Sequence, residues 1–174
     1  MPSLRVFVAA SFVCLLSTFP AVAQQWVEHR SSTSHFRAEF PGPPEIETID
    51  IPTPRGNAVY RAATTLTDNH IYKVVHMTPP PGAPPESPES LMRRHRDGAA
   101  SMFNGKVLFE RDVRAEPGAL RKILAVTAPP SKVAIFWVTI RDQDAYFTIY
   151  LCPPDEMEAP EGQRFMASFR LLPR

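Results

Sequence analysis

The chain has 174 residues, with 19 lysines and arginines against 18 aspartates and glutamates and a formal net charge of +1. A chain of this length fits one domain with a sizeable core. Its near-neutral balance lacks the basic footprint of a nucleic-acid-binding protein or of one held on an anionic membrane surface.

The first 23 residues are predicted to be a cleavable signal peptide. Arg5 precedes an apolar run at residues 6–16, and Pro20 ends the helical segment before a small-residue site at residues 21–23. This order predicts cleavage between Ala23 and Gln24. We therefore expect an exported protein, periplasmic or secreted, with a single domain over residues 24–174.

Two alternatives for this segment are a retained membrane anchor and a lipid-attachment site at Cys14. The apolar run is shorter than the ~20 residues that span a bilayer. Cys14 lies inside the run, without the small residues that a lipidation site needs. Both observations favour a protein with no membrane anchor after cleavage. Cys152 is then the one cysteine left, so no intramolecular disulfide can form.

The first strands follow from alternation of apolar and polar residues. Apolar and polar residues alternate around Trp26 and again over residues 35–40. In the second segment Phe36, Ala38 and Phe40 are predicted to lie on one face of a strand. Residues 47–53 are predicted to form a short strand whose Ile49 and Ile51 point inward. Residues 58–67 and 70–78 are predicted to form a hairpin that turns at Asp68-Asn69.

A helix is predicted after a proline-rich loop. Ser87 is a suitable N-cap, Pro88 suits the first helical position, and Asn104-Gly105 is typical of a left-handed end. One face of the helix is predicted to be buried, and it carries Leu91, Met92, His95, Ala99, Met102 and Phe103.

Four further strands are predicted as a meander over residues 106–115, 119–128, 133–141 and 145–152. Residues 133–140 are apolar on both faces, which indicates a central strand. A last helix begins near Pro160, and its apolar stripe is formed by Phe165, Met166, Phe169 and Leu172. The expected fold is α+β, with helices packed on a largely antiparallel sheet of about six to eight strands.

Two short motifs resemble those of PsbP-like domains. Residues 36–41 (Phe-Arg-Ala-Glu-Phe-Pro) are similar to the family's "F-x-x-x-F-P" opening, and residues 164–169 (Arg-Phe-Met-Ala-Ser-Phe) to its closing "R-F-x-x-S-F" helix. The order of elements also matches over about the whole chain after the signal peptide.

This resemblance implies an α/β/α sandwich and a mostly non-enzymatic role. Relatives include extrinsic subunits of the photosynthetic oxygen-evolving complex, a nuclear Ran-binding factor, exported bacterial proteins and chaperones for secreted toxins. Both motifs are core-packing patterns, so no functional residue of the family is carried over to this chain.

The histidines give no metal-binding pattern. His70 and His76 share a strand face but lie roughly 20 Å apart along it. A site assembled from different strands, such as His35 with His76, is the alternative to surface or structural histidines, which we favour. We predict no metal and no cofactor.

Two other residues have both a structural and a functional interpretation. His95 falls on the buried helix face, where a hydrogen-bonded neutral imidazole is favoured over a pH sensor. Cys152 ends a strand before Pro153-Pro154, and a packed, inert thiol is favoured over a nucleophile. Residues 93–96 (Arg-Arg-His-Arg) are interpreted as a solvated helix face, with a basic docking patch as the alternative.

The loop at residues 78–88 is the most distinctive surface segment. Its composition favours extended polyproline geometry, which is preordered for docking. The docking residues would be Pro79, Pro80, Pro81, Pro84 and Pro85. The alternative is a stiff connector between the hairpin and the helix.

No paired carboxylates, phosphate-binding loop or nucleophile elbow is present in the sequence. We therefore expect a non-catalytic binding or accessory protein that docks on another envelope protein. The alternative is a small exported enzyme or ligand binder with a site assembled across strands.

Overall fold

The computed structural model describes residues 25–174, so the predicted signal peptide and its cleavage site lie outside the described residues. Seven antiparallel strands form the main sheet, in the order β3-β4-β5-β9-β8-β7-β6. Their bounds are β3 Glu45–Thr53, β4 Gly56–Leu66, β5 Ile71–Thr78, β6 Val107–Val113, β7 Ala119–Ala128, β8 Lys132–Arg141 and β9 Asp144–Cys152. The expected α+β class and the size of the antiparallel sheet are confirmed.

A second, three-stranded sheet brings the two ends of the described chain together. Its strands are β1 (Val27–Ser31), β2 (Phe36–Phe40) and β10 (Arg170–Leu171), with β2 in the middle. The alternating side chains of β2 are buried at Phe36, Ala38 and Phe40, as the sequence pattern predicts.

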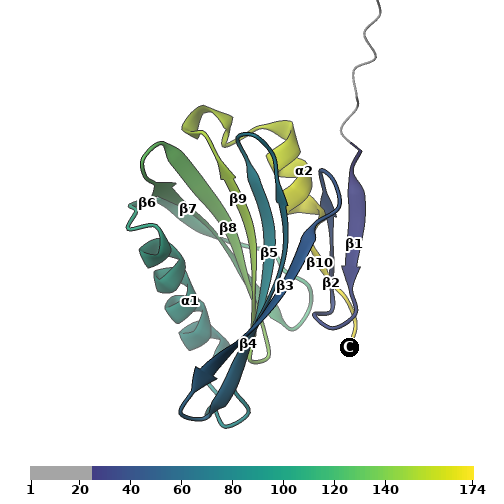
Figure 1. Ribbon diagram of the computed structural model, residues 1–174. Helices are drawn as coiled ribbons and strands as arrows, with labels where there is room; N and C mark the ends of the chain where they lie inside the picture. Colours follow the sequence, from purple (N-terminus) through teal and green to yellow (C-terminus); the bar gives the residue numbers. More distant parts are fainter. Residues whose placement is uncertain (1–24) are drawn as a thin grey trace, which may run out of the picture.

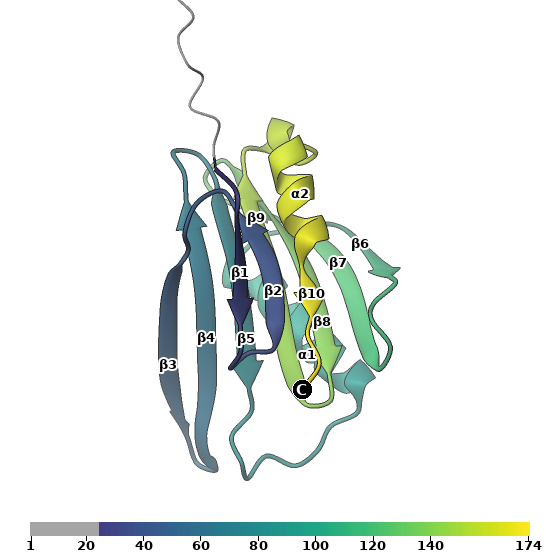
Figure 2. The same ribbon diagram turned by 90° about the vertical axis from the view of Figure 1, so that its right-hand side faces the viewer.

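The main sheet is covered by different elements on its two faces (Figure 1). Helix α1 (Pro88–Met102) packs on β7 and β8 on one face. Helix α2 (Pro160–Ser168) and the small sheet cover the other face, where α2 contacts β2 and β9. Figure 2 shows α2, β1, β2 and β10 in front of the main sheet, with α1 behind it. The molecule is therefore an α/β/α sandwich with a separate apolar core on each side.

The ends of α1 are set by the residues expected from the sequence. The Ser87 hydroxyl accepts a hydrogen bond from the Ser90 amide at 3.2 Å, and Pro88 occupies the first turn. After Met102 the chain leaves the helix through Asn104, whose φ of 48° is left-handed. A short 3-10 helix (Pro154–Glu156) connects β9 to α2.

Two predictions about buried residues are wrong. Ile49 and Ile51 were expected to point inward, but they are 43% and 40% exposed because no element covers β3 on either face. Met102 was placed on the buried face of α1, yet it is 64% exposed, because it lies on the side of the helix that borders an open groove instead of the covered strands. Alternation and helical spacing identify an apolar face but do not show whether anything covers it.

Candidate functional site

Three kinds of feature in the described residues could carry a function: reactive side chains, grooves and uncovered strands. The histidines and the cysteine are the side chains with the most varied chemistry. Within residues 25–174, no three His, Cys, Asp or Glu side chains gather as a metal site would require.

His76 lies in a buried cluster at the C-terminal end of β5. Its Nε2 is 3.3 Å from Asp144 Oδ2, and its ring stacks on Tyr146 with centroids 4.5 Å apart. Burial alone would raise the pKa of Asp144, but hydrogen bonding to His76 and the charges of His76 and Arg174 hold this pKa below its ordinary value. Arg174 also contacts Asp144, so the cluster fastens the end of the chain to the sheet.

Sequence reasoning missed this cluster because its members come from β5, β9 and the last residue. The structure does not bring His35 to it: His35 lies in the turn between β1 and β2, with a left-handed φ of 50°. His70 is held elsewhere, with Nε2 2.6 Å from Glu156 Oε2. His76 is only 3% exposed, which favours a structural role over catalysis.

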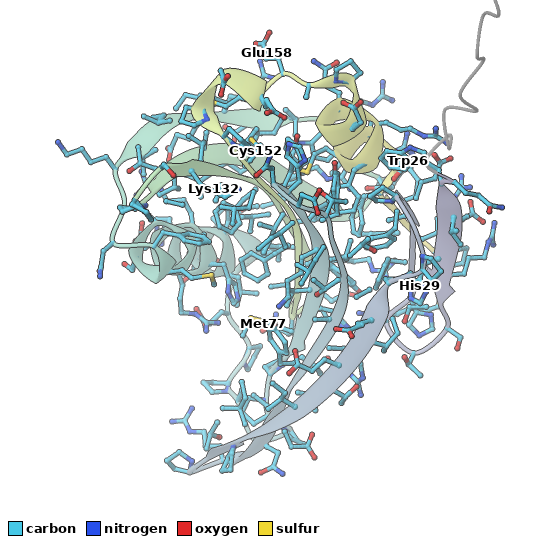
Figure 3. All side chains as sticks on the ribbon, turned by 45° about the horizontal axis from the view of Figure 1, so that its top comes forward. Trp26, His29, Met77, Lys132, Cys152 and Glu158 are labelled. Atoms are coloured by element: carbon cyan, nitrogen blue, oxygen red, sulfur yellow. The ribbon has the colours of Figure 1, made fainter. Side chains whose placement is uncertain are left out.

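Cys152, labelled in Figure 3, is fully buried in the apolar core on the α2 side of the main sheet. Burial raises the pKa of its thiol to about 11, and the nearby carboxylate of Glu156 acts in the same direction. A thiol of this kind is protonated at neutral pH and is a poor nucleophile.

His95 is half-buried on α1, where its ring packs edge-on against Phe147 with centroids 5.4 Å apart. Burial, assisted by the charge of Arg94, lowers the pKa of His95 to about 4. The imidazole is therefore neutral near pH 7; the hydrogen bond that the structural interpretation also expects stays a prediction.

The lowered pKa of His95 predicts an acid-dependent loss of stability. As the pH falls from 6.5 towards 4, the unfolded chain binds a proton at this residue that the folded chain does not, so the free energy of unfolding decreases. After allowance for the partial exposure of the ring, we expect a loss of about 1–2 kcal/mol. Urea titrations of the wild type and of His95→Gln at pH 7 and pH 4.5 measure it.

The variant should lose less stability than the wild type over this pH interval. His35→Asn is the control, because asparagine also accepts a left-handed φ and the change removes a histidine elsewhere. Equal pH dependence in the wild type and His95→Gln would contradict the assignment.

The proline-rich loop lies against the tip of the β3–β4 hairpin. A Cβ on Gly82 would be 3.0 Å from the carbonyl oxygen of Arg55, so the two backbones are close. The side-chain amide of Gln143 both donates to Glu86 O and accepts from Glu86 N, each at 3.0 Å. These contacts hold the loop against the rest of the protein at two places, which favours the interpretation of the loop as a stiff connector. A hollow of about 550 Å³ lies between the loop and the hairpin, and its lining includes Pro79, Pro80 and Pro84. Pro81 and Pro85 are exposed. Docking of a partner through this loop stays a prediction.

The basic run on α1 is largely neutralised by its neighbours. Arg94 pairs with Glu86 at 2.8 Å, and Arg96 contacts both Asp97 at 2.8 Å and Glu110 at 2.6 Å. A solvated, ion-paired helix face explains these residues without a docking patch.

An apolar groove, here named the α1 groove, lies beside helix α1. Because α1 packs on β7 and β8, the same face of the sheet is open over β4 and β5. The groove has a volume of about 500 Å³ and is lined by Tyr60, Phe103, Phe147, Ile149 and other apolar residues of β4, β5, β9 and α1. Met77, labelled in Figure 3, belongs to this lining and to the core on the α1 side. Volume and lining are typical of a binding site for a small ligand.

A second groove of about 620 Å³ lies on the other face, between α2 and the strands β6, β7 and β8. Trp137 and Met166 form part of its apolar floor, and Arg111, Asp155 and Glu158 lie on its lining. Its charges have mixed sign and do not converge, so the groove indicates no particular ligand.

The edge strand β3 is the most exposed element of the main sheet. Eight of its nine residues are exposed, including Ile46 at 61%. Its pairing with β4 runs without a bulge over the whole strand. In Figure 1 the β3–β4 hairpin projects beyond the rest of the sheet.

The opposite edge strand, β6, has the features that protect a sheet edge. It carries a register shift between Val107 and Phe109. Lys122 of the neighbouring strand pairs with Glu110 and Asp112 of β6, at 3.8 and 3.0 Å. Bulges and charges of this kind block edge-to-edge pairing. β3 has no bulge, and its carboxylates make no ion pair within the described chain, so its edge is open to a strand of complementary charge up to Pro52.

Taken together, the described residues form an α/β/α sandwich on an antiparallel sheet, with an open edge strand and an apolar groove and with no converging catalytic groups. Among solved structures, the chain is similar to cyanobacterial PsbP (CyanoP) from Synechocystis sp. PCC 6803, with a TM-score of 0.57 and 10% sequence identity. The likeness covers 90% of this chain and 98% of that one. It confirms the expected PsbP-like fold. No family model and no curated protein matches the sequence.

No helix among residues 25–174 is long and apolar enough to cross a membrane.

Proposed function

We propose that the protein is an exported, non-catalytic accessory protein that docks on another envelope protein through its edge strand β3. The proposal includes removal of residues 1–23 and a single domain over residues 24–174. The observation that carries it is the open edge of β3, with three exposed isoleucines on a strand that has no bulge. A partner strand added to this edge would gain main-chain hydrogen bonds and cover the isoleucines.

The charge of β3 identifies the kind of strand that would fit. Glu45, Glu47 and Asp50 are its three charged residues, and none makes an ion pair within the described chain. Two copies of β3 side by side would bring these carboxylates together, which disfavours self-association. A strand with lysine or arginine among apolar residues has complementary charge. Pro52 has no amide N–H, so pairing would be confined to the part of β3 that precedes it.

Charge reversal on β3 tests this proposal. In Glu47→Lys/Asp50→Lys the edge becomes basic and should repel a basic partner strand, so capture of the partner should fall by at least about tenfold. Both residues are exposed, and folding stability should change by no more than about 0.5 kcal/mol. The measurement is pull-down from the envelope fraction with tagged protein carrying a photo-cross-linker at Thr48, followed by mapping of the cross-linked peptide.

Asp68→Lys is the control, because Asp68 is an exposed carboxylate in the β4–β5 turn and is not part of β3. It should leave capture unchanged. The docking proposal fails if the double variant and the control capture the same partner equally well. It also fails if light scattering of the purified protein shows a dimer that the double variant dissolves, because β3 would then pair with a second copy. N-terminal sequencing of the exported product tests cleavage before Gln24.

A further inference from the structure

The α1 groove has a charge pattern that its apolar lining does not explain. Among the described residues that line it, Lys73 is the one lysine, arginine, aspartate or glutamate. In the register of the sheet Lys73 lies between Thr64 on β4 and Ile149 on β9, so it stands in the middle of the open face. A single cation surrounded by apolar side chains calls for an anionic group on an apolar ligand.

Lys73 has no carboxylate partner within the described chain. The Nζ atom of Lys73 lies 5.5 Å from the centroid of the Tyr60 ring. Within the described residues, Lys73 makes no ion pair and no other cation–π contact with an aromatic side chain. By register, the nearest carboxylate of β3 on this face is Glu45, which pairs with Thr64 and is two strands away, about 10 Å. The other titratable side chains of the lining are Tyr60 and His95, and His95 is neutral near pH 7 because burial lowers its pKa. The ammonium is therefore free to bind an anion.

The apolar part of the groove continues from Lys73 on both sides. Val75 and Phe147 form its floor, and Gly98 and Met102 of α1 form its wall. Met102 is 64% exposed at this wall, and Leu66 at one end of the groove is also 64% exposed. An alkyl chain lying along the floor would cover these side chains and remove their apolar surface from water.

We propose that the α1 groove binds a long-chain monocarboxylate, with the alkyl chain along the apolar floor and the carboxylate at the Lys73 ammonium. The site is separate from the β3 edge, so this binding goes beyond the docking function and does not depend on it. The hydroxyl of Thr64, beside Lys73 on the same face, is placed to donate a second hydrogen bond to the carboxylate.

Titration calorimetry of the full protein with decanoate, dodecanoate and tetradecanoate tests the proposal. We expect saturable binding of one ligand per chain, with Kd falling about fourfold for each added methylene. Dodecanol, which has the same chain without the charge, should bind about tenfold more weakly than dodecanoate. Lys73→Met should weaken dodecanoate about tenfold and leave dodecanol unchanged, whereas Lys73→Arg should retain both affinities.

Gly98→Leu provides a variant that narrows the groove from a position where an added Cβ meets no other atom. A Cβ on Gly98 meets no atom within 4 Å, and leucine is a better helix former than glycine. This variant should weaken the acid and the alcohol together. Equal affinity for dodecanoate and dodecanol, an unchanged dodecanoate Kd in Lys73→Met, or binding only above the concentration at which the ligand forms micelles would each overturn the proposal. Glu47→Lys/Asp50→Lys should bind dodecanoate like the wild type, so the docking function and the ligand site can fail separately.

Discussion

Gly162→Ala should destabilise the protein by about 3 kcal/mol, although alanine normally stabilises a helix. Gly162 lies in the first half of α2, directly above the ring of Tyr150. An added Cβ would be 2.2 Å from Tyr150 Cε1, well inside van der Waals contact. Tyr150 is fully buried and cannot swing away, so α2 would have to move off the core. Thermal or urea unfolding followed by circular dichroism measures the loss.

Gly98→Ala is the matched control in the other helix. Gly98 is exposed on α1, and its added Cβ would meet nothing within 4 Å. The same substitution should therefore stabilise the protein by about 0.5–1 kcal/mol through helix propensity. If the two variants shift the unfolding midpoint in the same direction, the close approach of α2 to Tyr150 is wrong.

The second large effect is expected at Arg121, whose replacement by methionine should destabilise the protein by about 3–4 kcal/mol. Arg121 is 6% exposed and donates to Glu116 Oε2 at 2.7 Å and to Thr139 Oγ1 at 2.8 Å. Its guanidinium lies 5.2 Å from the ring of Trp137 and 5.4 Å from the ring of Phe169. Methionine keeps most of the volume but removes the charge and both hydrogen bonds.

Loss of Arg121 also leaves Glu116 without its cation. Glu116 Oε1 accepts a 3.3 Å hydrogen bond from the Leu171 amide, so β10 should loosen in the variant. Glu116→Gln in the same chain should recover part of the lost stability, because a neutral amide needs no counter-charge. Lys122→Met is the control, since Lys122 pairs with carboxylates at the surface and should contribute less than about 1 kcal/mol. If Arg121→Met and Lys122→Met lower the free energy of unfolding in urea by the same amount, the Arg121–Glu116 pair does not have the stabilising role assigned to it.

The sequence predicts most of the core because periodicity reports burial wherever the apolar face of an element is covered by another element. The apolar strand β8 is buried on both faces, and Phe165 and Met166 of α2 are buried at the positions that helical spacing indicates. Phe169 and Leu172 were expected on the same helical stripe, but α2 ends at Ser168; Phe169 is buried in extended backbone and Leu172 follows β10. The same reasoning fails at β3, where alternation of isoleucine with polar residues is read as one buried face. The sequence does contain a signal there: three acids and no base on a strand with an apolar residue at every second or third position.

The α1 groove was out of reach of sequence reasoning for a different reason. Its lining comes from β4, β5, α1 and β9, and the groove exists because α1 covers β7 and β8 instead of β5. No local pattern determines which strands a helix covers. Lys73 is one lysine in an alternating strand, and only the register with Thr64 and Ile149 shows that it faces the open side.

The pairing of β10 with β2 has a consequence for the order in which the molecule assembles. Leu171 pairs with Phe36, so this contact joins residues separated by nearly the whole described chain. Loop closure of that length is slow relative to the local hairpins of the main sheet. The seven-stranded sheet can therefore form first, and β2 gains its second neighbour only when the last residues arrive. A chain interrupted before β10 would still contain all seven strands of the main sheet, with β2 paired to β1 alone and its other edge unpaired.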